Sequence, residues 1–268
     1  MPGLLLALRR LRHVLPILQL EGDSVSRIDA RLRKIAQRLR PVARVDAMLN
    51  AVEEVAAQDR QFRHGSARLK AELTQRRTKL SVGAVLRTST IDLSKILMRL
   101  SNLADELIGT RESAAALRAR TWAVKARVAR RALDLKRALD GAGAVYLPGR
   151  LGAVRRATRR FRLGVDVLRE VTQVVRDSDV KALEQLMDAL DRLRESERLV
   201  EHLRELQGAV SPPDLKAWQE LDDLTVAMEH RCRRFHGRYV RERQAVALVA
   251  DRLGARAGTG AASKRKVS

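Results

Sequence analysis

Three arginines near the middle of the chain are spaced so that they share one face of a helix. Arg155, Arg159 and Arg162 follow the order i, i+4, i+7, which stacks their side chains along that face. A guanidinium group binds phosphate through two parallel N–H groups, whereas an ammonium group acts as a point charge. The spacing therefore predicts a ladder of phosphate donors.

Two other segments repeat this arrangement, one near Ser24 and one near Leu117. Their basic residues are Arg27, Arg31, Lys34 and Arg38 in the first segment, and Arg120, Arg127 and Arg131 in the second. Like charges at i, i+4 destabilise a helix by roughly 0.2–0.5 kcal/mol per pair, so repeated pairs favour an anion lying among them. The alternative is that the stripes are solvated faces whose long aliphatic stems cover the edge of a core.

Residues that could catalyse a reaction or bind a metal are not grouped in this sequence. The histidines are scattered, at His13, His64, His202, His230 and His236. The nearest grouping, His230 with Cys232 and His236, lacks a fourth ligand, and no Ser–His–Asp spacing stands out. A glycine-rich phosphate loop of the form GxxxxGK[ST] is also absent. We therefore expect no enzymatic activity, no cofactor and no metal.

The composition indicates a polyanionic partner. The chain carries 54 Lys plus Arg against 32 Asp plus Glu, for a formal charge of +22, and such a field attracts anions. A single cysteine suits a reducing compartment. We read no export signal, and the chain has no run of 18 apolar residues, so we expect a cytoplasmic protein without a membrane span.

Apolar residues recur at helical spacing along almost the whole chain. Examples are Leu4, Leu8, Leu11, Leu15 and Leu18, and later Leu151, Val154, Phe161, Val165 and Leu168. This period predicts an all-α protein of amphipathic helices joined by short connections. We expect at least three-quarters of residues 4–253 to be helical. Residues 255–268 bury almost nothing, and we expect them to form a disordered basic tail.

An internal repeat relates the two ends of the chain. Arg9-Arg10-Leu11-Arg12 reappears as Arg159-Arg160-Phe161-Arg162, and an acidic residue follows each copy after 34 or 35 residues, at Asp46 and Glu197. The repeat indicates a duplicated helical unit.

Residues 151–170, LGAVRRATRRFRLGVDVLRE, resemble the signature helix of the CHAD family, the conserved histidine α-helical domains. Arg155, Arg159, Arg160 and Arg162 match its basic positions, and Gly152 stands where the family has a histidine. The first copy keeps Arg9, Arg10 and Arg12, but it has Leu5 at the earlier arginine and Pro2 at the histidine.

Other segments extend the resemblance over roughly residues 4 to 253. RLRPVARVDAMLN, with Asp46, looks like the second helix of the family, and LDRLRESERLVEHL looks like its duplicate. CRRFHGRYVRERQAV is similar to the last helices, where His236 matches a frequent histidine. The resemblance implies one domain over 1–254 with halves at about 1–140 and about 146–254. These halves would be two pseudo-two-fold-related four-helix bundles that flank a basic central groove.

The resemblance also implies non-catalytic binding of inorganic polyphosphate, on polyphosphate granules or beside polyphosphate-processing enzymes. We expect Arg9, Arg12, Arg155, Arg159 and Arg162 to face a common cleft. The full expected binding set is Arg9, Arg10, Arg12, Arg27, Arg31, Lys34, Arg38, Arg120, Arg127, Arg131, Arg155, Arg159, Arg160, Arg162 and His236. Two alternatives stay open: a nucleic-acid-binding protein that uses phosphate contacts, and a structural helical adaptor.

Overall fold

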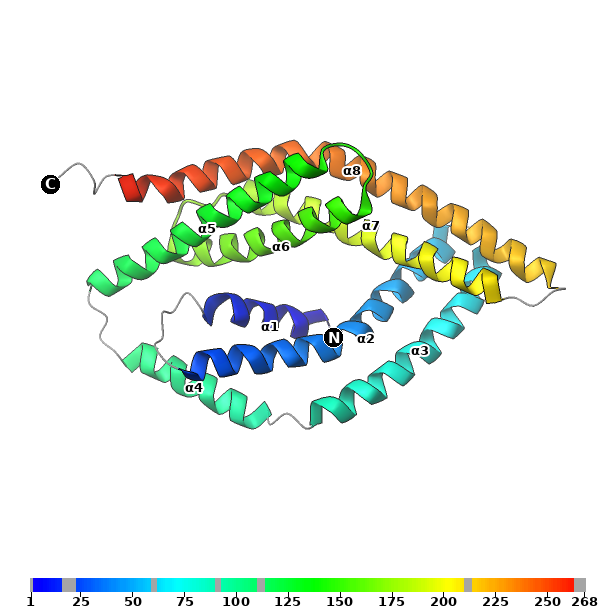
Figure 1. Ribbon diagram of the computed structural model, residues 1–268, viewed down its shortest axis with the longest axis horizontal. Coiled ribbons are helices and arrows are strands. Elements are labelled where there is room, and N and C mark those ends of the chain that lie inside the picture. The colour runs from blue at the N-terminus through cyan, green and yellow to red at the C-terminus, as the bar shows by residue number, and fades with distance from the viewer. Residues whose placement is uncertain are drawn as a thin grey trace.

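The computed structural model describes residues 2–15, 23–58, 62–89, 93–109, 114–209 and 214–262, and 95% of this part of the chain is helical, without a strand (Figure 1). The helices are α1 (Pro2–Val14), α2 (Asp23–Gln58), α3 (Arg63–Ser89), α4 (Leu93–Gly109), α5 (Ala114–Ala142), α6 (Pro148–Val171), α7 (Asp177–Ala209) and α8 (Leu215–Ala262). The prediction of an all-α protein with at least three-quarters of residues 4–253 helical is confirmed.

Local sequence explains several helix ends. Pro148 opens α6, where its missing N–H and fixed φ are tolerated. The first turn of α7 carries Asp177 and Asp179, whose negative charges are favourable at a helix N-terminus. Before α8, the Asp214 carboxylate accepts a hydrogen bond from the Ala217 N–H at 3.0 Å and caps the helix.

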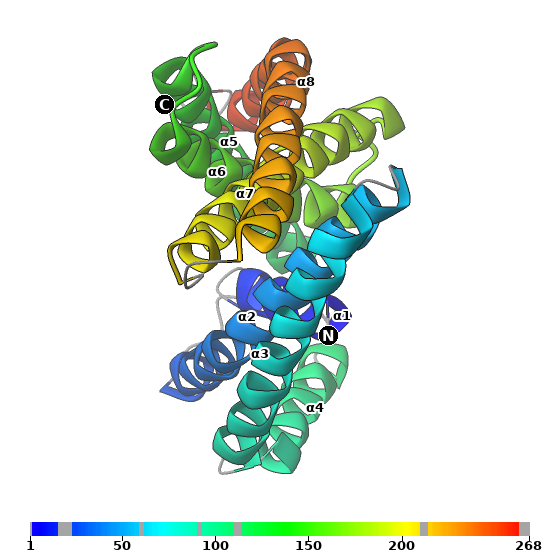
Figure 2. The ribbon, with the colours of Figure 1, turned by 90° about the vertical axis from the view of Figure 1, so that its right-hand side faces the viewer.

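Three apolar clusters hold the helices together. The largest joins α5, α6, α7 and α8 around buried residues such as Phe161, Leu183 and Tyr239. A second cluster joins the C-terminal half of α2 to α3, α7 and α8. A third joins α1, the N-terminal half of α2 and α4, through residues such as Leu8 and Ile28. Figure 2 shows α5, α6 and much of α8 at one end of the molecule and α4 at the other.

The packing joins the two halves expected from the sequence. Helix α5, which falls within the expected first half, packs against α6 and α8. The second cluster draws residues from both halves, for example Val52 and Leu69 from the first and Leu203 and Leu224 from the second. The boundary near residue 140 therefore does not divide two separate cores.

Helix α8 is longer than the sequence indicates. It runs for 48 residues and ends at Ala262, so residues 255–262, which we expected to be disordered, are helical. This segment contains no proline and four alanines, which favour a helix, although its two glycines disfavour one. The rest of the expected tail, residues 263–268, lies outside the described residues.

Helices α3 and α8 approach each other closely at Gly65. A Cβ atom at this position would lie only 2.8 Å from the backbone oxygen of Glu220, which cannot swing away as a side chain could. We expect Gly65→Ala to lower the free energy of unfolding by about 1–3 kcal/mol, the typical cost of overpacking. The control is Gly237→Ala within α8, where the nearest atom is Arg241 Nη1 at 3.9 Å.

Urea denaturation of both variants makes the comparison. The control should gain roughly 0.5–1 kcal/mol, because alanine is a better helix former than glycine. Equal effects of the two substitutions would show that close approach at Gly65 is unimportant.

Candidate anion-binding site

Arginines from three helices meet beside α7, where α1 contacts both α2 and α6. We call Arg9 of α1, Arg40 of α2, and Arg155 and Arg159 of α6 the arginine cluster. Burial, followed by repulsion from Arg159, Arg40 and Arg155, lowers the pKa of Arg9 to about 10. Burial also lowers the pKa of Arg159, with Arg155 and Arg40 contributing. The pKa shifts show that positive charge is crowded at this junction.

Asp191 of α7 neutralises part of this charge. The Arg155 Nε donates a hydrogen bond to Asp191 Oδ1, and the Arg159 Nη2 donates to both Asp191 oxygens at 2.8 and 2.9 Å. One carboxylate thereby fixes the two α6 arginines in place. Asp191 also attracts Arg9, but this attraction affects the pKa of Arg9 less than the repulsion from Arg159 or from Arg40 does.

An open pocket of about 380 Å³ lies between α2, α3 and α7. Its wall includes Arg44 of α2, Arg76 of α3, and Arg194 and Arg198 of α7. Burial, then repulsion from Arg194, Arg44 and Arg155, lowers the pKa of Arg198 to about 10. Because Arg155 repels both Arg9 and Arg198, the pocket and the arginine cluster form one electrostatic region.

The pocket also holds carboxylates, so its floor is not uniformly basic. Glu201, His202 and Glu205 of α7 line it. His202 Nε2 lies 2.5 Å from the Glu72 carboxylate of α3, and its Nδ1 lies 3.3 Å from the Glu205 carboxylate. The contact between His202 and Glu72 ties α3 to α7.

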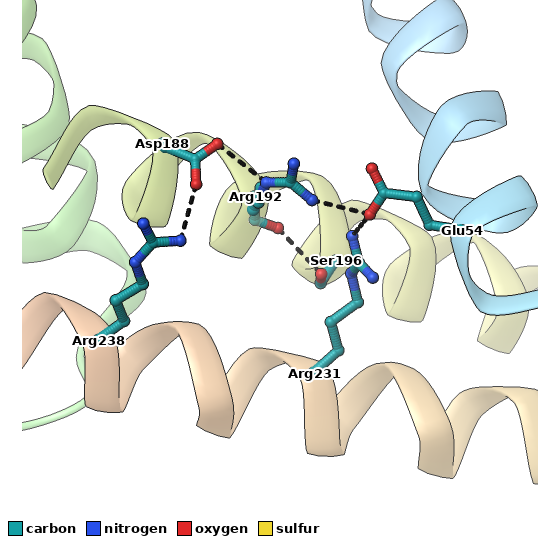
Figure 3. A network of polar contacts seen from close by, with 6 residues as sticks. All are labelled: Glu54, Asp188, Arg192, Ser196, Arg231 and Arg238. Carbon is teal, nitrogen blue, oxygen red and sulfur yellow. Dashed lines mark hydrogen bonds and ion pairs between the residues drawn. The ribbon is translucent and has the colours of Figure 1, made fainter. Parts of the chain in front are cut away.

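A polar network holds α2 against α7 and α8 and so positions Arg40 and Arg44 (Figure 3). The Glu54 carboxylate of α2 accepts hydrogen bonds from Arg192 of α7, at 2.8 Å, and from Arg231 of α8. Asp188 in turn accepts from Arg192 and from Arg238, both at 2.9 Å. The Arg231 side chain is only 5% exposed, so the Glu54 carboxylate compensates a buried positive charge.

The arginines expected at a common cleft divide into two groups. Arg9, Arg155 and Arg159 come together. Arg12 and Arg162 instead bind carboxylates of their own helix or of the next one. The Arg12 Nε donates to Asp29 at 2.7 Å, and Arg162 contacts Asp166 at 2.8 Å and Glu184 at 2.9 Å. Arg10 is exposed on α1.

The expected stripe on α2 does not supply the arginine that joins the cluster. Arg40 lies two residues beyond Arg38, which turns it about 200° around the helix. The stripe Arg27, Arg31, Lys34 and Arg38 therefore projects from another side of α2. Sequence reasoning missed Arg40 and Arg44, although their i, i+4 spacing was a usable signal.

The remaining expected residues lie elsewhere. Arg131 of α5 interacts with Arg127 and with Arg160 of α6, on a different surface. Arg120 is half-buried on α5. His236 packs between Tyr146 and Tyr239, with ring centroids 5.1 and 5.9 Å away. Burial lowers the pKa of His236, so this residue takes part in packing around α8 instead of in the arginine cluster.

No family model, curated protein or solved structure matches this chain. Among the described residues, none of the helices combines the length and apolar character needed to cross a membrane. Within the same part of the chain, no three His, Cys, Asp or Glu side chains are grouped to hold a metal ion.

The raised pKa of Glu195 should make the stability of this region depend on pH. This residue lies one turn after Asp191 on α7, and burial, followed by repulsion from Asp191, raises its pKa to about 7, although Arg155 and Arg192 oppose the shift. A carboxyl group whose folded pKa is raised stabilises the protein below its unfolded pKa. This contribution disappears as the pH rises through the folded value.

We expect Glu195→Gln to remove this pH dependence. The wild type should lose stability relative to the variant between pH 5 and pH 8, by roughly 1–2 kcal/mol, because each pKa unit corresponds to about 1.36 kcal/mol and the group is partly solvated. Urea denaturation at the two pH values measures the difference. Glu170→Gln, at an exposed position on α6, is the control, and an identical pH profile for both variants would contradict the assignment.

Adjacent glutamates on α2 allow a test of the polar network. We expect Glu54→Ala to lower the free energy of unfolding by about 2–4 kcal/mol, because it leaves the buried Arg231 charge without its carboxylate. Glu53→Ala removes only an exposed pair with Lys70 at 2.5 Å and should cost about 0–1 kcal/mol. Thermal or urea unfolding compares the two, and similar losses would show that the network adds little to the α2 contact.

Proposed function

We propose that this protein binds inorganic polyphosphate without turnover, and that the arginine cluster with its adjoining pocket is the binding surface. The observation that carries the proposal is the crowding of Arg9, Arg40, Arg155 and Arg159 beside Asp191, which, within this cluster, forms hydrogen bonds only with Arg155 and Arg159. Burial, together with repulsion from neighbouring arginines, lowers the pKa of Arg9 and of Arg159. Such crowding is unfavourable in the free protein. An anion lying among the guanidinium groups would relieve it.

Polyphosphate suits this surface better than a nucleic acid that is read through its bases. A flexible chain of phosphates presents one repeated anionic group, which many guanidinium donors can share through charge-assisted hydrogen bonds. Binders of single-stranded nucleic acids stack bases on aromatic side chains. This chain has only seven aromatic residues, and three of them, Phe161, Phe235 and Tyr239, are buried.

The proposal includes the CHAD-like architecture, in which two related halves flank the basic groove. Two contacts support a relation between α1–α2 and α6–α7. Arg12 in the first arginine repeat binds Asp29 near the start of α2, and Arg162 in the second binds Glu184 near the start of α7. The repeated arginines Arg9 and Arg159 also lie close enough to repel each other. Gly152 and Pro2, at the histidine positions, leave arginine as the main donor.

The decisive variant is Arg9→Gln with Arg40→Gln, which removes two positive charges without breaking the clamp on Asp191. We expect its affinity for long-chain polyphosphate to fall at least about tenfold, because a hydrogen bond to a charged group contributes roughly 1.5–3 kcal/mol and 1.4 kcal/mol is tenfold. The control is Arg63→Gln with Lys216→Gln, at exposed positions on α3 and α8. It removes the same charge and should change affinity less than about threefold, since salt screens exposed charges over about 8–10 Å.

Titrations of wild type and both variants at two salt concentrations, with an assay for released phosphate, test the proposal. Equal losses in the two variants would mean that net charge alone drives binding. Tighter binding of duplex DNA than of polyphosphate at equal phosphate concentration would favour a nucleic-acid-binding protein. Inertness towards both would favour an adaptor, and phosphate release by pure wild type would contradict the absence of turnover.

A further inference from the structure

A second basic surface lies between α5 and α6, turned away from the arginine cluster. Arg156 and Arg160 each follow directly after an arginine of the cluster, Arg155 or Arg159. Consecutive residues project about 100° apart around an α-helix. Helix α6 therefore presents one pair of arginines towards α1 and α7 and a second pair towards α5.

The α5–α6 surface contains an open pocket of about 340 Å³, within the range of about 300–1,000 Å³ that is common for small-molecule sites. Arg131, Arg156 and Arg160 stand around it, and one carboxylate, Asp134, lies at its wall. The other lining residues are Ala138, Ala153 and Ala157. Their short side chains leave space between the guanidinium groups.

Packing holds Arg131 in position on this surface. Its Nη1 donates a hydrogen bond to the Arg160 backbone oxygen at 2.8 Å. The close approach of the helices depends on Gly164, where a Cβ would lie 3.2 Å from Val128 Cγ2 and 3.7 Å from Arg131 Nη1. Burial, followed by repulsion from Arg127 and Arg160, lowers the pKa of Arg131 to about 10, and Asp134 opposes this only in part. Positive charge is therefore in excess here as well.

We propose that the α5–α6 pocket is a second, separate binding site for a phosphate-class anion, held by Arg131, Arg156 and Arg160. The inference takes its ligand class from the proposed function but uses different residues. Because α6 separates the two sites, a short oligophosphate in one site does not contact the other. A long polyphosphate chain bound at one site of one molecule can then engage the other site of a neighbouring molecule.

Calorimetric titration with tripolyphosphate at low salt counts the sites. The full-length protein should bind two per chain. The double variant Arg156→Gln with Arg160→Gln should bind one, because it loses only the site at the α5–α6 pocket. Both side chains are exposed, so their removal should leave the fold intact. Arg9→Gln with Arg40→Gln should also bind one, and Arg63→Gln with Lys216→Gln should keep two.

The outcomes separate this inference from the proposed function. A single site in wild type that only the Arg9/Arg40 variant loses would overturn the second site and leave the proposed function standing. A single site that only the Arg156/Arg160 variant loses would support the α5–α6 site and overturn the location proposed for the first. Equal losses in all three variants would overturn both.

Mixing with long-chain polyphosphate tests whether the natural ligand of the α5–α6 pocket is a segment of a longer chain or a free small phosphate. If the α5–α6 pocket accepts a segment of a chain, light scattering should rise several-fold when wild type is mixed with long-chain polyphosphate, and each double variant at either site should abolish the rise. If tripolyphosphate fills two sites but long chains cause no association in any variant, the second site binds free small phosphates, and the site itself stands.

Discussion

Burial of α7 along two different apolar surfaces is the constraint on which the rest of the structure depends. Leu183, Leu186 and Leu190 face the cluster shared with α5, α6 and α8, whereas Leu199 and Leu203 face the cluster shared with α2 and α3. Full burial of a leucine side chain contributes about 1.5–3 kcal/mol, so α7 cannot rotate without a large loss. Its fixed orientation directs Asp191 towards α6 and brings α2 alongside.

The distribution of carboxylates decides which arginines hold the structure together and which remain available to an anion. Arg192, Arg231 and Arg238 share Glu54 and Asp188 within the helix contacts. In the arginine cluster, by contrast, Asp191 bonds Arg155 and Arg159, while Arg9 and Arg40 add further positive charge beside this pair. Arginine thus contributes to stability in the polar network and to excess positive charge in the arginine cluster, because the carboxylates available to pair with it differ between the two.

The helices and the shared face of Arg155 and Arg159 on α6 could be predicted from the sequence, because both depend on spacing within one segment. The face of α2 that brings Arg40 to the arginine cluster could not be predicted in this way. Its N-terminal half packs with α1 and α4 and its C-terminal half with α3, α7 and α8, so the face that carries Arg40 is set by contacts far away in the chain. The clamp on Asp191 and the packing of His236 against Tyr146 were hidden for the same reason.

Helices α7 and α8 each contribute side chains to two of the three apolar clusters. Opening the cluster around α2 and α3 would therefore expose leucines on the same continuous helices that fill the cluster around α5 and α6. Regions that share long, rigid elements tend to open together as one cooperative unit. Although the sequence repeats itself, these two clusters should unfold in a single transition. A cut near residue 140 would separate α5 from its partners in one cluster and α2 and α3 from theirs in the other.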